Sequence, residues 1–169
     1  MAYRTKTFVS FDGDNDIHYY RLMCAWKGHD HIAFGDNFAD AHDMNSARDS
    51  STEESIKAQL RKRFENSKNF ILLVGDNTRY LRKFVPWEIE QAIQLNLPPI
   101  VVNLNGLRQM DGNLCPPGIR DALAIHVSFN AAILQHALDN WPTTFESLRS
   151  QGKTGAYFYN ESTYRQLGL

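Results

Sequence analysis

The chain has 169 residues, of which 43% are hydrophobic and 22% are charged, and its formal net charge is −1. This length suits one domain with its own core, and the charge does not favour a nucleic-acid surface. No apolar run is long enough to cross a bilayer, and the first residues lack the apolar core of a signal peptide. We therefore expect one cytoplasmic domain over residues 1–169, without nucleic-acid or membrane partners and with Cys24 and Cys115 reduced and unbonded.

Strands and helices are expected to alternate in the first part of the chain. The elements, in order, are a strand at 5–11, a helix at 14–27, a weak strand at 31–34, a loop at 35–42 and a helix that carries Ile56, Leu60 and Phe64. The polar cluster at 12–16 ends the first strand, because its Asp, Asn and Gly residues favour turns. Ser51 and Glu54 have the spacing of a capping box, which predicts the start of the second helix.

The segment 68–105 is the centre of the predicted fold. Two apolar runs, at 69–75 and 97–104, read as strands that are buried on both faces. Between them, Pro86 favours the start of a helix and keeps the residue before it out of the helical region. A strand–helix–strand unit of this kind implies a parallel sheet. Glu88 is then expected in the first turn of the helix, beside the carboxyl edge at which open parallel sheets bind ligands.

The last third continues the alternation. It predicts a loop at 106–117, a strand at 122–129, a helix that Pro142 interrupts, and an aromatic peripheral tail at 152–169. Five strands that alternate with helices indicate a flavodoxin-like, doubly wound, parallel five-stranded α/β sheet.

The acids after the first strand suggest two functional motifs, a calcium loop and a receiver domain, and neither fits the rest of the sequence. Asp12, Asp14 and Asp16 suggest a calcium loop, but Ile17 and Met23 stand where an EF-hand needs Gly and Glu. A turn and a helix cap explain these acids better. The same acids and Asp76 would suit a phospho-acceptor receiver domain, but no Lys follows the strand at 122–129.

A metal site is not expected elsewhere. His29 and His31 lack a third ligand at a suitable spacing, and a solvated turn explains them better.

Glu88 is the acid with the strongest functional context. A Glu at the start of a helix is ordinarily a surface residue that offsets the helix dipole. Here the large aromatic residues Phe84 and Trp87 stand beside it, at the edge where ligands bind.

Four short segments resemble TIR domains, and more narrowly the TIR-like proteins of the bacterial Thoeris anti-phage system. They are residues 7–11 with the acids that follow, residues 72–78, the aromatic-x-x-x-Glu-Ile segment at 84–89, and the closing residues 164–169. The chain departs from the pattern at Phe84, where many relatives have Trp, and at Pro86. Neither change removes the acid.

The resemblance implies an NAD glycohydrolase or ADP-ribosyl cyclase, with Glu88 as the catalytic carboxylate and NAD as substrate rather than cofactor. A carboxylate held against the ribose would stabilise the positive charge that grows as nicotinamide leaves. Phe84 and Trp87 would stack on a ring of the substrate. A cyclic product would act as a messenger for a separate effector protein. A homo-oligomer is a further expectation, because TIR-like enzymes often need assembly.

Other substrate-binding candidates lie in the loops after the first two strands. They are Phe11, Asp12, Asp36 and Asn37. Two other functions remain open at this point. One is a nucleoside deoxyribosyltransferase-like enzyme, which shares the topology and a glutamate at a glycosidic bond. The other is a TIR-like interaction module without activity.

Overall fold

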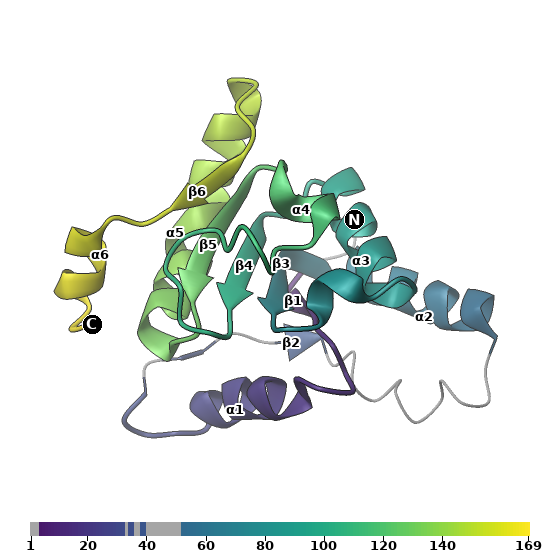
Figure 1. The fold of residues 1–169 in the computed structure, drawn as a ribbon, viewed down its shortest axis with the longest axis horizontal. Coiled ribbons are helices and arrows are strands. Elements are labelled where there is room, and N and C mark those ends of the chain that lie inside the picture. Colours follow the sequence, from purple (N-terminus) through teal and green to yellow (C-terminus); the bar gives the residue numbers. More distant parts are fainter. Residues whose placement is uncertain (1–3, 33, 36–37, 40–51) are drawn as a thin grey trace.

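The structure is a computed structural model that describes residues 4–169 except 33, 36–37 and 40–51. Figure 1 shows its strands and helices. In chain order they are β1 (Lys6–Ser10), α1 (Ile17–Lys27), β2 (Phe38–Ala39), α2 (Glu53–Glu65), β3 (Ser67–Val74), the 3₁₀ turn η2 (Thr78–Tyr80), α3 (Phe84–Gln94), β4 (Pro99–Asn103), α4 (Pro117–Arg120), β5 (Ala124–Ser128), α5 (Ala131–Ser150), β6 (Ala156–Phe158) and α6 (Glu161–Gln166).

All strand pairs in the sheet are parallel, and the strand order is β2-β1-β3-β4-β5-β6. The first five strands follow the flavodoxin order, which confirms the predicted fold class, and β6 extends the sheet beside β5. The order reverses direction between β1 and β3, so the loops that leave these two strands diverge to opposite faces. Such a switch point at the carboxyl edge is where open α/β sheets bind ligands.

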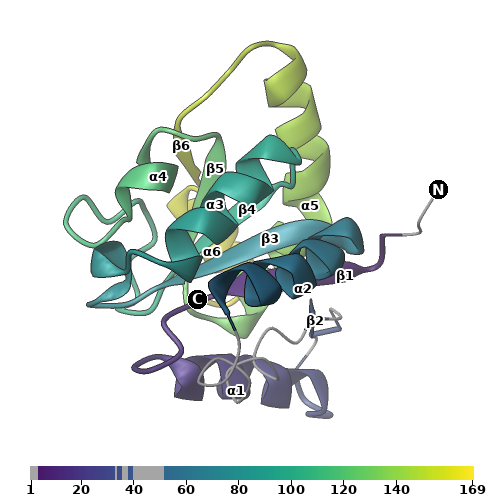
Figure 2. The same cartoon turned by 90° about the vertical axis from the view of Figure 1, so that its right-hand side faces the viewer.

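Each face of the sheet has its own core, because successive strand residues point to opposite faces. Phe8 packs with α2, α3 and α4, whereas its neighbour Val9 packs with α1, α5 and α6. Figures 1 and 2 show α2 and α3 together on one side of the sheet and α5 on the other. The two cores explain why the apolar runs of β3 and β4 show no alternation in the sequence.

The second strand lies later than predicted. Residues 31, 32 and 34 are not part of a strand; Ile32 N donates to His29 O in a turn, and Phe34 N donates to Ile32 O. The apolar residues Ile32 and Phe34, which suggested a strand, pack against the core instead, and Phe34 is buried against Trp26 with ring centroids 5.6 Å apart. The second strand is β2, in the segment predicted as loop, and it pairs with β1 on the side away from β3, with Phe38 opposite Thr7.

Helices α2, α3 and α5 also differ from the sequence pattern. The cap of α2 is Thr52, whose side chain accepts from Ser55 N at 3.2 Å, rather than Ser51. Helix α3 begins at Phe84, so Pro86 stands inside its first turn, where a missing N–H costs no hydrogen bond. Helix α5 continues through Pro142 for 20 residues, because its buried face holds both halves against the sheet.

Among the described helices, none has the length and apolar character needed to cross a membrane. The two cysteines, both within the described ranges, are not joined by a disulfide, as the sequence predicts. Cys24 is exposed on α1 and Cys115 is buried beside α4.

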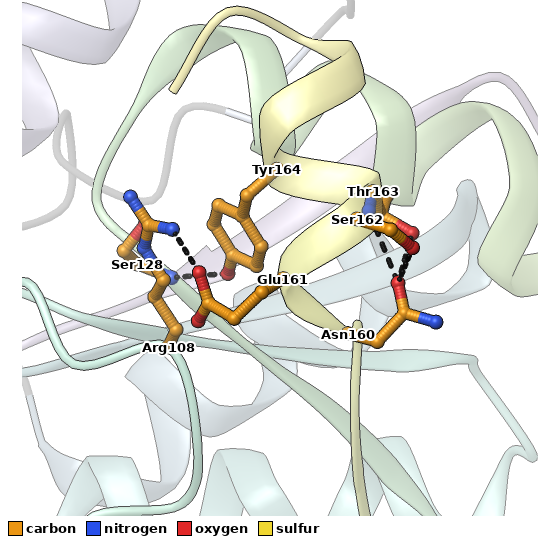
Figure 3. A network of polar contacts seen from close by, with 7 residues as sticks. All are labelled: Arg108, Ser128, Asn160, Glu161, Ser162, Thr163 and Tyr164. Atoms are coloured by element: carbon orange, nitrogen blue, oxygen red, sulfur yellow. Dashed lines mark hydrogen bonds and ion pairs between the residues drawn. The ribbon is translucent and has the colours of Figure 1, made fainter.

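The C-terminal segment is more than the peripheral tail that the sequence suggests. It adds β6 to the sheet and inserts Tyr164 of α6 into the core, where the side chain has 0% exposure. Figure 3 shows the contacts that hold it. Ser128 N, at the end of β5, donates to the Tyr164 hydroxyl at 3.3 Å. The Arg108 guanidinium lies 4.2 Å from the centroid of the Tyr164 ring and forms an ion pair of 2.7 Å with Glu161.

Candidate active site

A pocket of about 200 Å³ opens at the carboxyl edge of the sheet, between the loop after β1 and the start of α3. Its walls are Phe11, Asp12, Gly13, Asp14 and residues 81–85. Three of the predicted site residues, Phe11, Asp12 and Phe84, therefore meet around one hollow. This pocket is called the edge pocket below.

Phe11 and Asp12 give the edge pocket a fixed wall. The Phe11 ring is stacked on Tyr20 of α1 with centroids 4.9 Å apart. The Asp12 side chain is 2% exposed, and its carboxylate accepts from Asp14 N at 3.1 Å and from the Asn15 side chain at 2.8 Å. Its carboxylate thus shapes the loop, which agrees with the turn explanation of this acid.

Glu88 lies deeper than predicted. It stands in the second turn of α3 rather than the first, and its side chain is only 3% exposed. Phe84 and Val85, four and three residues earlier on the same helical face, both line the edge pocket. Because side chains tilt toward the N-terminus of a helix, the carboxylate is directed toward the turn that forms the pocket wall. The surface explanation of this acid is wrong, since a surface acid would be exposed.

Trp87 points elsewhere. Its ring packs against α2, 6.2 Å from the Phe64 ring and 5.5 Å from the Arg61 guanidinium. The Lys57 ammonium lies 5.6 Å from the same ring. Trp87 does not line the edge pocket, so the aromatic residue that reaches this hollow from α3 is Phe84. A direct stacking role for Trp87 stays a prediction.

Two predicted binding residues, Asp36 and Asn37, lie outside the described residues. The described ranges contain no group of three or more His, Cys, Asp or Glu side chains that would hold a metal ion.

Asp16, for which the sequence pattern predicts no functional role, lies at the switch point. Its side chain is 7% exposed, and within the described part of the chain Oδ2 has no hydrogen-bond partner. A Cβ on Gly75, at the end of β3, would lie 2.4 Å from that oxygen. Burial and then the charge of Asp12 raise the pKa of Asp16 above its usual value. The glycine that ends an apolar strand was the one signal in the sequence for this close approach.

Two cations were also missed. Arg82 and Lys83 line the edge pocket beside Phe84, and both are exposed. Basic residues just before a helix that follows a strand are the signal that marks them, because an anionic ligand at this edge would meet them first.

A parallel sheet in the flavodoxin order, with a buried glutamate one turn below a pocket at its carboxyl edge, is the arrangement expected of a TIR-like domain. A family model confirms this class: residues 8–109, well over half of the chain, match the family described as Thoeris protein ThsB, TIR-like domain. The chain belongs to this family, and it is a defence-related TIR-like module.

Proposed function

We propose that this chain cleaves the bond between nicotinamide and ribose in NAD and makes an ADP-ribose-type signal. The observation that supports this function best is the position of Glu88, a carboxylate that is 3% exposed and one helical turn from the pocket wall. Removing a carboxylate from water is costly, so the burial of this acid at a ligand edge favours a chemical role over that of an ordinary surface acid.

The proposed reaction breaks the glycosidic bond at C1′ of the ribose. The bonding electron pair leaves with nicotinamide, which departs as a neutral molecule, and positive charge develops on the ribose ring. The Glu88 carboxylate stabilises this charge, and it does so more strongly in a site shielded from water. Attack by water at C1′ gives ADP-ribose and releases a proton. Attack by a nucleophile of the same ADP-ribose gives a cyclic product.

The walls of the edge pocket suit this reaction. Phe84 and Phe11 offer apolar surface to the nicotinamide end of the substrate, and the stack of Phe11 on Tyr20 keeps that wall in place. The rest of the lining is largely polar, with Asp12 and Asp14 on one element and Arg82 and Lys83 on the other, so these two rings supply much of the apolar part of the pocket. Trp87 would then act indirectly, by holding α2 against α3.

Membership of the Thoeris family also suggests the protein partners of this chain. In a Thoeris context a separate effector protein would respond to the diffusible product, and assembly of several copies of this chain would precede activity. We propose both partners on the membership of the chain in the Thoeris family.

The test uses nicotinamide release from NAD, with deoxynucleosides as a second substrate class. Glu88→Gln keeps the size of the side chain and removes its charge. Glu90→Gln is the matched control, because Glu90 is an exposed residue of the same helix. We expect Glu88→Gln to lower the rate by about 10²–10³ or more, as for the loss of one transition-state contact, and Glu90→Gln to leave it near wild type.

The same assay is run over a wide range of protein concentrations, because activity is expected to require the assembly of several copies of the chain. Release of a free base from deoxynucleosides, with NAD untouched, would favour the transferase-like alternative. Wild-type protein that cleaves neither substrate at any concentration refutes the proposed enzyme, as does a folded Glu88→Gln variant with wild-type turnover.

A further inference from the structure

A second and larger hollow adjoins the edge pocket. It has a volume of about 450 Å³ and lies between the β3–α3 connection and the start of α4. Its lining residues are 78–82, Val85, Pro86, Ile89 and 116–118. Leu81, Arg82 and Val85 line both hollows, so the two share a wall. This second hollow is called the α4 groove below.

The volumes of the two hollows indicate that a large ligand would occupy both of them. Small-molecule sites typically have about 300–1,000 Å³. The edge pocket, at about 200 Å³, is below that range, whereas the α4 groove lies within it. A dinucleotide with its nicotinamide riboside in the edge pocket must therefore place its other half outside, and the adjoining space is the α4 groove.

The walls of the α4 groove suit a flat aromatic ring. Pro86, Pro117 and Ile89 are apolar, and the ring of Tyr80 is 66% exposed at the rim. The Arg79 guanidinium lies 5.3 Å from the centroid of the Tyr80 ring and also donates to Asn113 O. Arg79 thus braces the Tyr80 loop against the loop before α4 and holds the ring as a stacking surface.

A cation stands at the border of the two hollows. Arg82 lines both of them and is exposed. A guanidinium at this place matches the diphosphate that joins the two halves of a dinucleotide, because its planar fork binds phosphate oxygens in pairs.

We propose that the α4 groove binds the adenosine half of the dinucleotide substrate, with Arg82 on the diphosphate between the two hollows. This inference rests on the proposed function for the identity of the substrate. It implies that residues of the β3–α3 connection and of α4, outside the edge pocket, make the protein prefer a dinucleotide as its substrate.

The test fills the groove and measures binding without turnover. A Cβ on Gly118 would lie 3.6 Å from Cγ2 of Ile89, so a side chain at this position enters the hollow. Gly118→Leu is the filling variant. Gly112→Leu is the matched control, because Gly112 is exposed in the same loop region and its Cβ would meet nothing within 4 Å. Tyr80→Ala is a second variant, at an exposed position where truncation leaves the fold intact.

The probe is ADP, which is titrated into each protein by calorimetry, with inorganic pyrophosphate as a comparison. We expect Gly118→Leu and Tyr80→Ala to weaken ADP binding about tenfold, in line with the loss of one base–aromatic contact, and Gly112→Leu to bind as wild type. Pyrophosphate should bind more weakly than ADP and equally to all four proteins.

The outcomes separate this inference from the proposed function. ADP that binds equally to wild type and Gly118→Leu, or no better than pyrophosphate, overturns the adenosine assignment even if NAD is cleaved. ADP binding that the filling variant abolishes supports the assignment even if nicotinamide release fails, in which case only the reaction is refuted. Wild-type protein that binds no ADP at millimolar concentration overturns the assignment as well.

Discussion

His126 should make the protein sensitive to mild acid. It lies in the middle of β5 with 0% exposure, and among the described residues neither ring nitrogen has a hydrogen-bond partner. Burial lowers the pKa of His126 from 6.5 to about 4. Protonation of the folded protein would place an imidazolium in an apolar layer, beside Val101 of β4.

The sign of the effect follows from the two protonation states. The folded pKa is below the unfolded pKa, so the unfolded chain takes up the proton first as the pH falls. Stability is therefore unaffected above about pH 6.5 and decreases from there to about pH 4. One pKa unit corresponds to about 1.4 kcal/mol, so the full loss amounts to about 3 kcal/mol of unfolding free energy. That is a large part of the total stability of about 5–15 kcal/mol of a typical domain.

The assay is urea unfolding followed by tryptophan fluorescence between pH 4.5 and pH 7.5. The perturbation is His126→Leu, which keeps a similar volume and removes both unpaired nitrogens. The variant should be at least as stable as wild type at neutral pH, because it no longer buries polar atoms without partners. The difference between the two proteins should shift steadily in favour of the variant as the pH falls.

The difference in stability between His126→Leu and wild type isolates the effect of His126, because other groups titrate in the same pH range. Burial raises the pKa of Asp16, so its effect has the opposite sign and stabilises the fold as the pH falls through the folded pKa. His136→Gln, at a partly exposed position of α5, serves as the control and should retain the wild-type pH profile. If His126→Leu follows the wild-type profile over the whole range, the burial of His126 does not determine the acid sensitivity.

Three further outcomes follow from contacts described above. Gly75→Ala should lower the unfolding free energy by about 1–3 kcal/mol, because the new Cβ meets the buried Asp16 carboxyl, and unchanged urea unfolding would contradict that contact. A thiol reagent at pH 7.5 should label Cys24 alone in folded protein, since burial also raises the pKa of Cys115 to about 11, and mass spectrometry that finds two labels would oppose this. Tyr164→Phe should cost about 1–3 kcal/mol, because it leaves a buried N–H of β5 without an acceptor, and equal melting curves would rule out that hydrogen bond as a stabilising contact.

The sequence predicts the parts of the fold that have strong local patterns. Strands β3 and β4 are continuous apolar runs, and Ile56, Leu60 and Phe64 mark one face of α2 by their spacing. Strand β2 has only two residues, which is too few to show any periodicity, so the predicted position of the second strand was wrong. The start of α3 was also wrong, because the preference against helix before Pro86 is weaker than the packing of Val85 in the core.

The candidate site was predictable only in part, for a geometric reason. Phe11, Asp12 and Phe84 follow strands that end at one edge, so topology brings them together. Trp87 and Glu88 are neighbours in sequence, yet on a helix they point about 100° apart, and Trp87 faces α2 instead. The α4 groove combines residues from 78–89 and 116–118, and no local pattern reveals that these segments meet.

The two cores set a limit on how the chain can be divided. The family match ends at residue 109, shortly after β4, but half of the buried residues in the core beneath α1 and α5 come from later in the chain. A fragment cut at that point would leave Ile100 and Val102 without the helix that covers them, and β4 would become an unpaired edge. Such a fragment should aggregate rather than fold. The part of the sequence that matches the family model is thus shorter than the unit that folds, and gene fusions or domain swaps with this chain should take the whole segment through α6.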